Sequence, residues 1–273
     1  MVKRKDTQGL SEEEFLRQYN PNDYIRPSVT TDLLIVGVAR DYSSLKVLLV
    51  KRAEHPFIDS WALPGGFVQN DETAHCAANR IMESKTHLRN VYLDQIYTFT
   101  KPDRDPRMRV MSIAYLSLIC EPDEMEESNK DDEAWFNLSF TDDSIELSNK
   151  ELNTRIVYRL KKESFKNGAI KYENFTASLK SKQSLAFDHI EIVIEGIKRL
   201  REQVFYGNQA FCLVEKTFTL PELQLVYELI LNRPLYKKSF RDMVSSKISE
   251  TGGEKKSRVA GGRKSKEYIM KER

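Results

Sequence analysis

The residues best suited to chemistry surround one glycine-rich turn, Pro64-Gly65-Gly66. Glu72 follows Gly66 after five intervening residues, and Arg80 follows Glu72 after seven. Glu83 is the only carboxylate in the next helical turn. Carboxylates on a helix can hold hard cations such as Mg²⁺, which bridge phosphate groups. The segment is therefore a candidate for phosphate chemistry. The number of carboxylates on one helix face decides whether it can hold a metal ion and cleave a phosphate bond or can only bind the phosphate.

This spacing, with the preceding Trp61-Ala-Leu-Pro-Gly-Gly-Phe-Val68, resembles the signature of the Nudix family. The resemblance implies a mixed-sheet α/β/α sandwich. It also implies an activity, because Nudix enzymes cleave a pyrophosphate with divalent cations held by glutamates on one helix face. In that family the glutamates lie one, four and five residues after the arginine.

The residues at those three positions here are Ile81, Ser84 and Lys85, and His87 replaces the glycine that follows them. Three negative charges have become one positive charge. At ~4 Å and an effective dielectric of ~20, one unit charge repels another by about 4 kcal/mol, so Lys85 would oppose a cation. It could pair with a phosphate instead. We therefore expect a phosphate-binding pocket without turnover.

Two alternatives stay open for the box. Glu72 and Glu83 could hold Mg²⁺ and retain some hydrolysis, although helix geometry places Glu83 about 160° from Ile81 and Lys85. The match could also be misaligned. No metal site is predicted, because His75, Cys76 and His87 lack zinc-ligand spacing. Three cysteines without close spacing, Cys76, Cys120 and Cys212, argue against a disulfide framework.

The elements that must position these residues follow from hydrophobic periodicity and turn signals. A capping box predicts a helix from Ser11 to Gln18. Strands are predicted at 32–39, 45–50, 91–100 and 108–120 and around Trp135. Residues 72–87 and 187–204 are expected to be helical, and 121–133 an acidic loop. Asn167-Gly168 favours a hairpin within 150–180.

The C-terminal part has a different composition. Residues 232–273 carry a net charge of +8, whereas residues 1–231 carry −6. A capping box at Thr219 begins one helix, a second is expected at about 237–247, and a glycine-rich basic hairpin follows. This is the element order of a winged helix, whose second helix fits a major groove about 12 Å wide. The candidate DNA contacts are Lys237, Lys238, Ser239, Arg241, Ser245, Arg258, Arg263 and Lys264. A solvated basic face is the alternative interpretation.

A second resemblance combines both halves of the chain. The segments that carry it include 51–57, 102–107, 185–189 and 218–235, and their order is similar to that of the Nudix-related transcriptional regulators of NAD metabolism. That family joins a Nudix-like domain, often with a degenerate box, to a winged helix. The resemblance implies a dimeric bacterial repressor that senses ADP-ribose or a related nucleotide and binds a double-stranded DNA operator.

The same resemblance suggests a set of ligand contacts. Arg52, Arg104 and Arg107 would bind the pyrophosphate, since planar guanidinium groups suit it. Phe57 would stack on an adenine or belong to the core. Asp188 and His189 would close the pocket, or Asp188 would simply cap the helix. With Gly66 and Lys85 these residues complete the predicted site, namely Arg52, Phe57, Gly66, Lys85, Arg104, Arg107 and His189.

The predicted organisation has three parts: an N-terminal extension at 1–30, a ligand-binding domain at 31–205 and a winged helix at 206–273. No apolar run approaches the ~18–20 residues of a membrane span, and the N-terminus lacks a secretory signal, so a cytoplasmic protein is expected. No cofactor is expected. One competing hypothesis is a MutT/Nudix pyrophosphohydrolase of ADP-ribose or nucleoside diphosphate sugars, which would need Mg²⁺. Another is a purely structural or interaction module.

Overall fold

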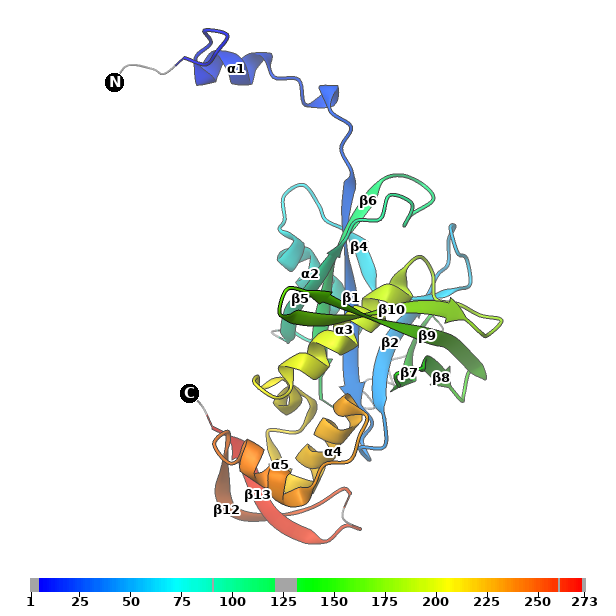
Figure 1. The fold of residues 1–273 in the computed structure, drawn as a ribbon, viewed down its shortest axis with the longest axis vertical. Helices are drawn as coiled ribbons and strands as arrows, with labels where there is room; N and C mark the ends of the chain where they lie inside the picture. Colours follow the sequence, from blue (N-terminus) through cyan, green and yellow to red (C-terminus); the bar gives the residue numbers. More distant parts are fainter. Residues whose placement is uncertain (1–4, 90, 121–131, 260, 272–273) are drawn as a thin grey trace.

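The structure, a computed structural model, describes residues 5–89, 91–120, 132–259 and 261–271. Residues 5–27 form an arm that extends away from the rest of the molecule (Figure 1). The arm contains helix α1 (Glu12–Gln18) and a short 3₁₀ turn, η1 (Pro21–Asp23). The predicted capping box is present, because the Ser11 hydroxyl and the Glu14 carboxylate each accept a backbone hydrogen bond from the other residue.

A ten-stranded mixed sheet forms the centre of the following part (Figure 1). Its order is β10-β9-β8-β7-β2-β1-β6-β5, with β3 beside β2 and β4 beside β1. The β1–β6 pair is parallel and the other pairs are antiparallel. The strands are β1 (Ser28–Val38), β2 (Leu45–Lys51), β3 (Trp61–Ala62), β4 (Gly65–Phe67), β5 (Tyr92–Phe99), β6 (Val110–Ile119), β7 (Glu133–Phe140), β8 (Ser144–Asn149), β9 (Thr154–Asn167) and β10 (Ile170–Leu179).

Helices α2 (Ala74–Thr86) and α3 (His189–Gln203) cover opposite faces of this sheet. Alternation along β1 produces the two layers, because successive side chains of a strand point to opposite faces. Leu33 and Ile35 belong to the apolar cluster that includes α2 residues, whereas Leu34 and Val36 belong to the cluster that includes α3 residues. The expected α/β/α sandwich is thus confirmed.

The predicted elements are present with small shifts at their ends. Helix α2 begins after Thr73, whose hydroxyl accepts from Cys76 N–H at 3.1 Å. The hairpin near Asn167 turns through Gly168 and Ala169, since Asn167 pairs with Ile170 and Gly168 has a φ of 60°. Strand β8 was not predicted, although its buried Ile145 and Leu147 alternate with polar neighbours. An acidic loop was predicted at 121–133, and residues 121–131 of it lie outside the described residues.

The C-terminal part is a winged helix, as predicted. Its helices are α4 (Leu220–Leu231) and α5 (Lys237–Val244), and its sheet has the order β11-β13-β12. The strands are β11 (Thr217–Thr219), β12 (Ile248–Lys256) and β13 (Lys264–Met270), preceded by the 3₁₀ helix η3 (Gln209–Leu213). Helix α5 ends at Val244, three residues before the predicted end.

The two parts share one hydrophobic core. Leu200 and Val204 at the end of α3 belong to the same buried cluster as Phe211 of η3 and Tyr227 of α4. The buried apolar cluster therefore continues across the domain boundary that was predicted between residues 205 and 206. In the described part of the chain, no helix is long and apolar enough to cross a membrane.

Candidate functional site

A cavity of about 210 Å³ opens where the first strands of the sheet meet the start of α3. Arg52, Gly66, Arg104, Arg107 and His189 line it, so five predicted ligand-binding residues from distant segments come together. The wall also contains Asp32, Leu63, Gly65, Phe67, Asp105 and Phe187, among others.

The inner wall is a buried ionic cluster around Arg104. The guanidinium donates to both carboxylate oxygens of Asp188, at 3.0 and 2.7 Å, and to Asp32 at 3.4 Å. All three side chains are less than 10% exposed. Burial opposes the charge of Arg104, but the hydrogen bonds that it donates to Asp188 and the charge of Asp32 outweigh this effect and raise the pKa of the guanidinium. Arg104 is therefore a charged wall residue whose charge is already balanced.

His189 closes the cavity from the first turn of α3. Its Nδ1 accepts from the Leu63 backbone N–H at 2.9 Å, and its Nε2 lies 3.7 Å from Asp32. Burial lowers the pKa of this imidazole, although the nearby charges of Asp32 and Asp188 oppose the shift. A neutral imidazole that accepts at Nδ1 carries its proton on Nε2. The side chain of Asp188 makes no capping hydrogen bond, and it accepts instead from Arg104, which lines the cavity.

The outer wall carries two arginines around one aromatic ring. The Cζ of Arg52 lies 4.8 Å from the centre of the Phe187 ring, and the Cζ of Arg107 lies 5.9 Å from it. Arg52 donates to the Pro56 carbonyl at 2.7 Å, whereas Arg107 pairs with Asp105 at 2.8 Å. Burial and repulsion by Arg107 lower the pKa of Arg52. An anion between the two guanidinium groups would relieve this repulsion, so the outer wall is suited to a phosphate.

Phe187 was missed as a site residue, and Phe57 does not line the cavity. The two rings pack with their centres 4.8 Å apart, and Phe57 is 39% exposed. Phe187 adopts a φ of 53°, which is rare for a bulky residue and places it where α3 begins. Asp32 was also missed, although a carboxylate at the start of an otherwise apolar strand was a usable signal.

The box residues on α2 do not line the cavity. Ile81 is 5% exposed and packs in the core cluster with Leu33 and Trp135. The Lys85 ammonium lies 2.7 Å from Glu133 of β7, so the structure does not bring it into the cavity with the other predicted ligand contacts. Ser84 Oγ donates to the Ile81 carbonyl at 2.8 Å.

The remaining carboxylates of the box are paired with arginines. Arg80 donates to Glu72 at 3.1 Å through Nε, and this contact lowers the pKa of the carboxyl. Glu83 accepts from Arg89 at 2.6 Å. A divalent cation would need several oxygen ligands directed at one point. The residues present do not fit such an ion, and the described residues contain no cluster of three metal-binding side chains.

The winged helix presents a basic surface. Five predicted DNA contacts, Lys237, Lys238, Ser239, Arg241 and Ser245, are exposed on or just after α5. Arg263 and Lys264 are exposed near the tip of the β12–β13 hairpin. Arg258 differs, because its guanidinium pairs with Glu215 while its backbone N–H donates to the buried Glu222. The structure thus brings seven of the eight predicted residues to two exposed elements.

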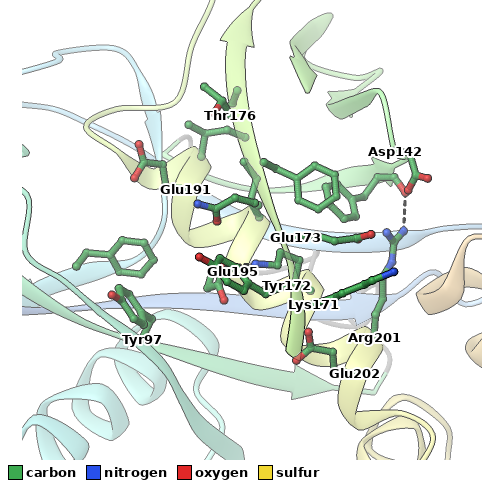
Figure 2. A pocket seen from close by; sticks show the side chains of 18 of the residues that line it. Tyr97, Asp142, Lys171, Tyr172, Glu173, Thr176, Glu191, Glu195, Arg201 and Glu202 are labelled. Atoms are coloured by element: carbon green, nitrogen blue, oxygen red, sulfur yellow. Dashed lines mark hydrogen bonds and ion pairs between the residues drawn. The ribbon is translucent and has the colours of Figure 1, made fainter. Parts of the chain in front are cut away.

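A larger groove of about 1080 Å³ lies elsewhere, between β10, β5 and α3 (Figure 2). None of the predicted ligand-binding residues lines it. Its walls combine aromatic side chains such as Tyr97 and Tyr172 with charges of both signs, including Glu195 and Arg201. The convergence of arginines favours the smaller cavity as the anion site.

Fold and site together define a Nudix-like ligand-binding domain with an altered box, joined to a winged helix. Residues 33–152 match the NUDIX domain family, and residues 210–270 match the NrtR DNA-binding winged helix domain. The ADPR responsive transcriptional repressor NtrR of Acinetobacter baylyi is 31% identical over 261 residues, which are 94% of this chain and 88% of the relative. The chain therefore belongs to the NrtR family of Nudix-related transcriptional regulators, which confirms the resemblance seen in the sequence.

Two solved structures have a similar architecture. A MutT/nudix family protein from Enterococcus faecalis has a TM-score of 0.76 and 29% identity, and the match covers 96% of this chain and 94% of that one. Shewanella oneidensis NrtR complexed with a 27mer DNA has a TM-score of 0.65 and 26% identity, and the match covers 89% and 93%. Both matches span the sandwich and the winged helix.

Proposed function

We propose that this chain is a transcriptional repressor that binds an operator through α5 and the wing and responds to ADP-ribose or a similar nucleotide. The observation that carries the proposal is the pairing of an arginine-lined cavity with a box that has lost its metal ligands. The match to the ADPR responsive transcriptional repressor NtrR of Acinetobacter baylyi covers 88% of that protein, and its name supports the choice of ligand. In this proposal the cavity binds the nucleotide without cleaving it, and no cofactor is required.

The cavity size defines how the ligand would lie. Pockets that enclose a whole small molecule usually measure about 300–1,000 Å³, whereas this cavity measures about 210 Å³. It can enclose the phosphate groups, while the remainder of the nucleotide extends over the outer wall. Arg52 and Arg107 then contact the phosphates, and the exposed edge of Phe57 or Phe187 is available to a base.

Replacing Arg52 with methionine is expected to weaken ADP-ribose binding by about 10- to 100-fold. A hydrogen bond to a charged group contributes about 1.5–3 kcal/mol, and the variant loses one such donor. Calorimetry with ADP-ribose measures the change. The exposed Arg155, which pairs with Glu146 far along the sheet, supplies the control R155M. Equal affinity of R52M and the wild type would contradict the assignment of the cavity.

Replacing Lys237, Lys238 and Arg241 together with alanine is expected to weaken DNA binding by about one to two orders of magnitude. Each lost phosphate contact should also reduce the slope of log K against log salt by about 0.9, so the triple variant should be flatter by about 2–3. Fluorescence anisotropy over a salt series on a DNA duplex selected with the full chain measures both. The control removes three exposed lysines of the sandwich, Lys166, Lys180 and Lys182. An unchanged slope would exclude α5 as the DNA-binding element.

We further propose that two copies act together on the operator. Winged and other helix-turn-helix dimers place their recognition helices about 34 Å apart, one turn of DNA. The expectation comes from the family, and its measurement is the mass of the protein by light scattering with and without DNA. An operator with two half-sites at this spacing agrees with the proposal.

A further inference from the structure

Helix α3 extends from the cavity to the winged helix. It has fifteen residues, which correspond to a length of about 22 Å. At its start, His189 lines the cavity and accepts from Leu63, and the adjoining Asp188 holds Arg104. Any rearrangement of the cavity wall by a bound anion therefore acts directly on the first turn of this helix.

The other end of α3 is fastened to the first helix of the winged helix by Arg201. Its Nε donates to the Ile230 carbonyl of α4 at 2.8 Å, and Nη2 donates to the Phe140 carbonyl of β7 at 2.6 Å. The guanidinium also lies over the Phe140 ring, 4.3 Å from its centre. One side chain thus connects three elements. Figure 2 shows it beside Asp142, whose charge partly offsets the lowering of the pKa of Arg201 by burial.

The Ile230 carbonyl that Arg201 binds lies near the connection between α4 and α5. Ile230 is in the last turn of α4, where carbonyl groups lack partners within the helix. Only five residues separate the end of α4 from the start of α5, so the direction of α4 sets the position of the DNA-binding helix. The residues after α3 also contact the segment between α5 and β12, because Lys247 Nζ donates to the Gly207 carbonyl at 2.6 Å.

The interface around Arg201 is closely packed. Leu200 of α3, Val204 directly after this helix, and Val226 and Ile230 of α4 are fully buried in one apolar cluster. Close-packed interiors shift as units and do not deform continuously. A movement at the start of α3 therefore reaches α4 through packed side chains and the Arg201 hydrogen bonds.

We infer that α3 couples occupancy of the cavity to the orientation of the winged helix, with Arg201 as the positioning residue at the DNA-binding end. This inference rests on the proposed function and assigns the part of the chain that regulates it. Arg201 touches neither the nucleotide cavity nor the exposed face of α5. Its replacement should change the coupling between the two sites without removing either one.

The test compares the Kd for DNA measured with saturating ADP-ribose and the Kd measured without it. The coupling ratio is the larger of these two Kd values divided by the smaller. Couplings between two sites typically amount to about 5- to 150-fold. We expect a wild-type ratio in this range and a ratio below about twofold for R201M. The Kd of the DNA-free protein for ADP-ribose should stay within about twofold of the wild type.

The matched control is R199M on the same helix. Arg199 Nε donates to Asp94 of β5 at 2.8 Å, so this contact stays within the sandwich. The control should keep the wild-type ratio. If circular dichroism shows that R201M does not fold, R201K replaces it. One ammonium group cannot reproduce the planar fork of the guanidinium, so the coupling ratio of R201K should be at least threefold smaller than that of the wild type.

The outcomes separate the two proposals. The role of Arg201 is overturned if the wild-type ratio is above fivefold and R201M retains it. If R201M does not fold, retention of the ratio by a folded R201K has the same meaning. Either result leaves the proposed function intact. A wild type that binds DNA without any response to ADP-ribose overturns the proposed function, and the inference with it. Loss of the ratio in R201M together with its retention in R199M supports the inference.

Discussion

Replacing Arg104 with methionine is expected to lower the free energy of unfolding by about 3–5 kcal/mol. Removing one partner of a buried ion pair leaves the other charge without compensation, and this is where the cost arises. Here two carboxylates, Asp32 and Asp188, would lose their common partner while they remain buried. Chemical denaturation monitored by circular dichroism measures the change.

The matched control for this prediction is R155M. Arg155 forms the same two-pronged contact, with Glu146 at 2.8 and 2.7 Å, but its side chain is 67% exposed. Exposed pairs of this kind contribute about 0–1 kcal/mol. If R104M and R155M lowered the free energy of unfolding by similar amounts, burial of the Arg104 cluster would not be the cause of the loss. Adding D188N to R104M should recover part of the stability, because it removes one of the two unpaired charges.

Replacing Ile81 with glutamate, the residue expected there in a hydrolase, should destabilise the fold by at least about 3 kcal/mol. The substitution removes an apolar side chain from the core and buries a carboxyl group among Leu33, Met82 and Trp135. Restoring the first metal ligand is therefore expected to damage the fold and not to create an enzyme. The restoration is further opposed by Lys85, which lies on the same helix.

Thermal or chemical unfolding of I81E with and without Mg²⁺ tests this expectation. I81L, which conserves volume, should lose less than about 1.5 kcal/mol and controls for simple repacking. The expectation is wrong if I81E is as stable as the wild type. It is also wrong if Mg²⁺ stabilises I81E but not the wild type, because the carboxylate would then reach a metal-binding position.

Local patterns in the sequence account for most of the elements. The Ser11 and Thr219 capping boxes, the alternation along β1 and the apolar stripe of α3 each depend on residues within a few positions of one another. Strand and helix periods constrain these elements directly. The loss of the metal ligands at Ile81, Ser84 and Lys85 is equally local, because their spacing from Arg80 is read along a single helix.

The arrangement of the site depended on contacts between residues far apart in the chain. Asp32, Arg104 and Asp188 come from three segments, and their buried pairing required the β1–β6 pair and the start of α3. The sequence placed Lys85 with the ligand contacts, but its partner is Glu133 on β7. Arg258 was likewise a predicted DNA contact, and its guanidinium pairs with Glu215.

The physical reason for this division is the range of the forces involved. Periodicity, capping and turn chemistry act over a few residues and are visible in one dimension. Burial of a charge is acceptable only where a specific partner arrives from another element, and that pairing exists only after the sheet and α3 have packed. The residues alone determined the class of fold, the altered box and the basic winged helix, whereas only the packed structure showed that Arg104 is held between two buried carboxylates and that Arg201 joins the two halves.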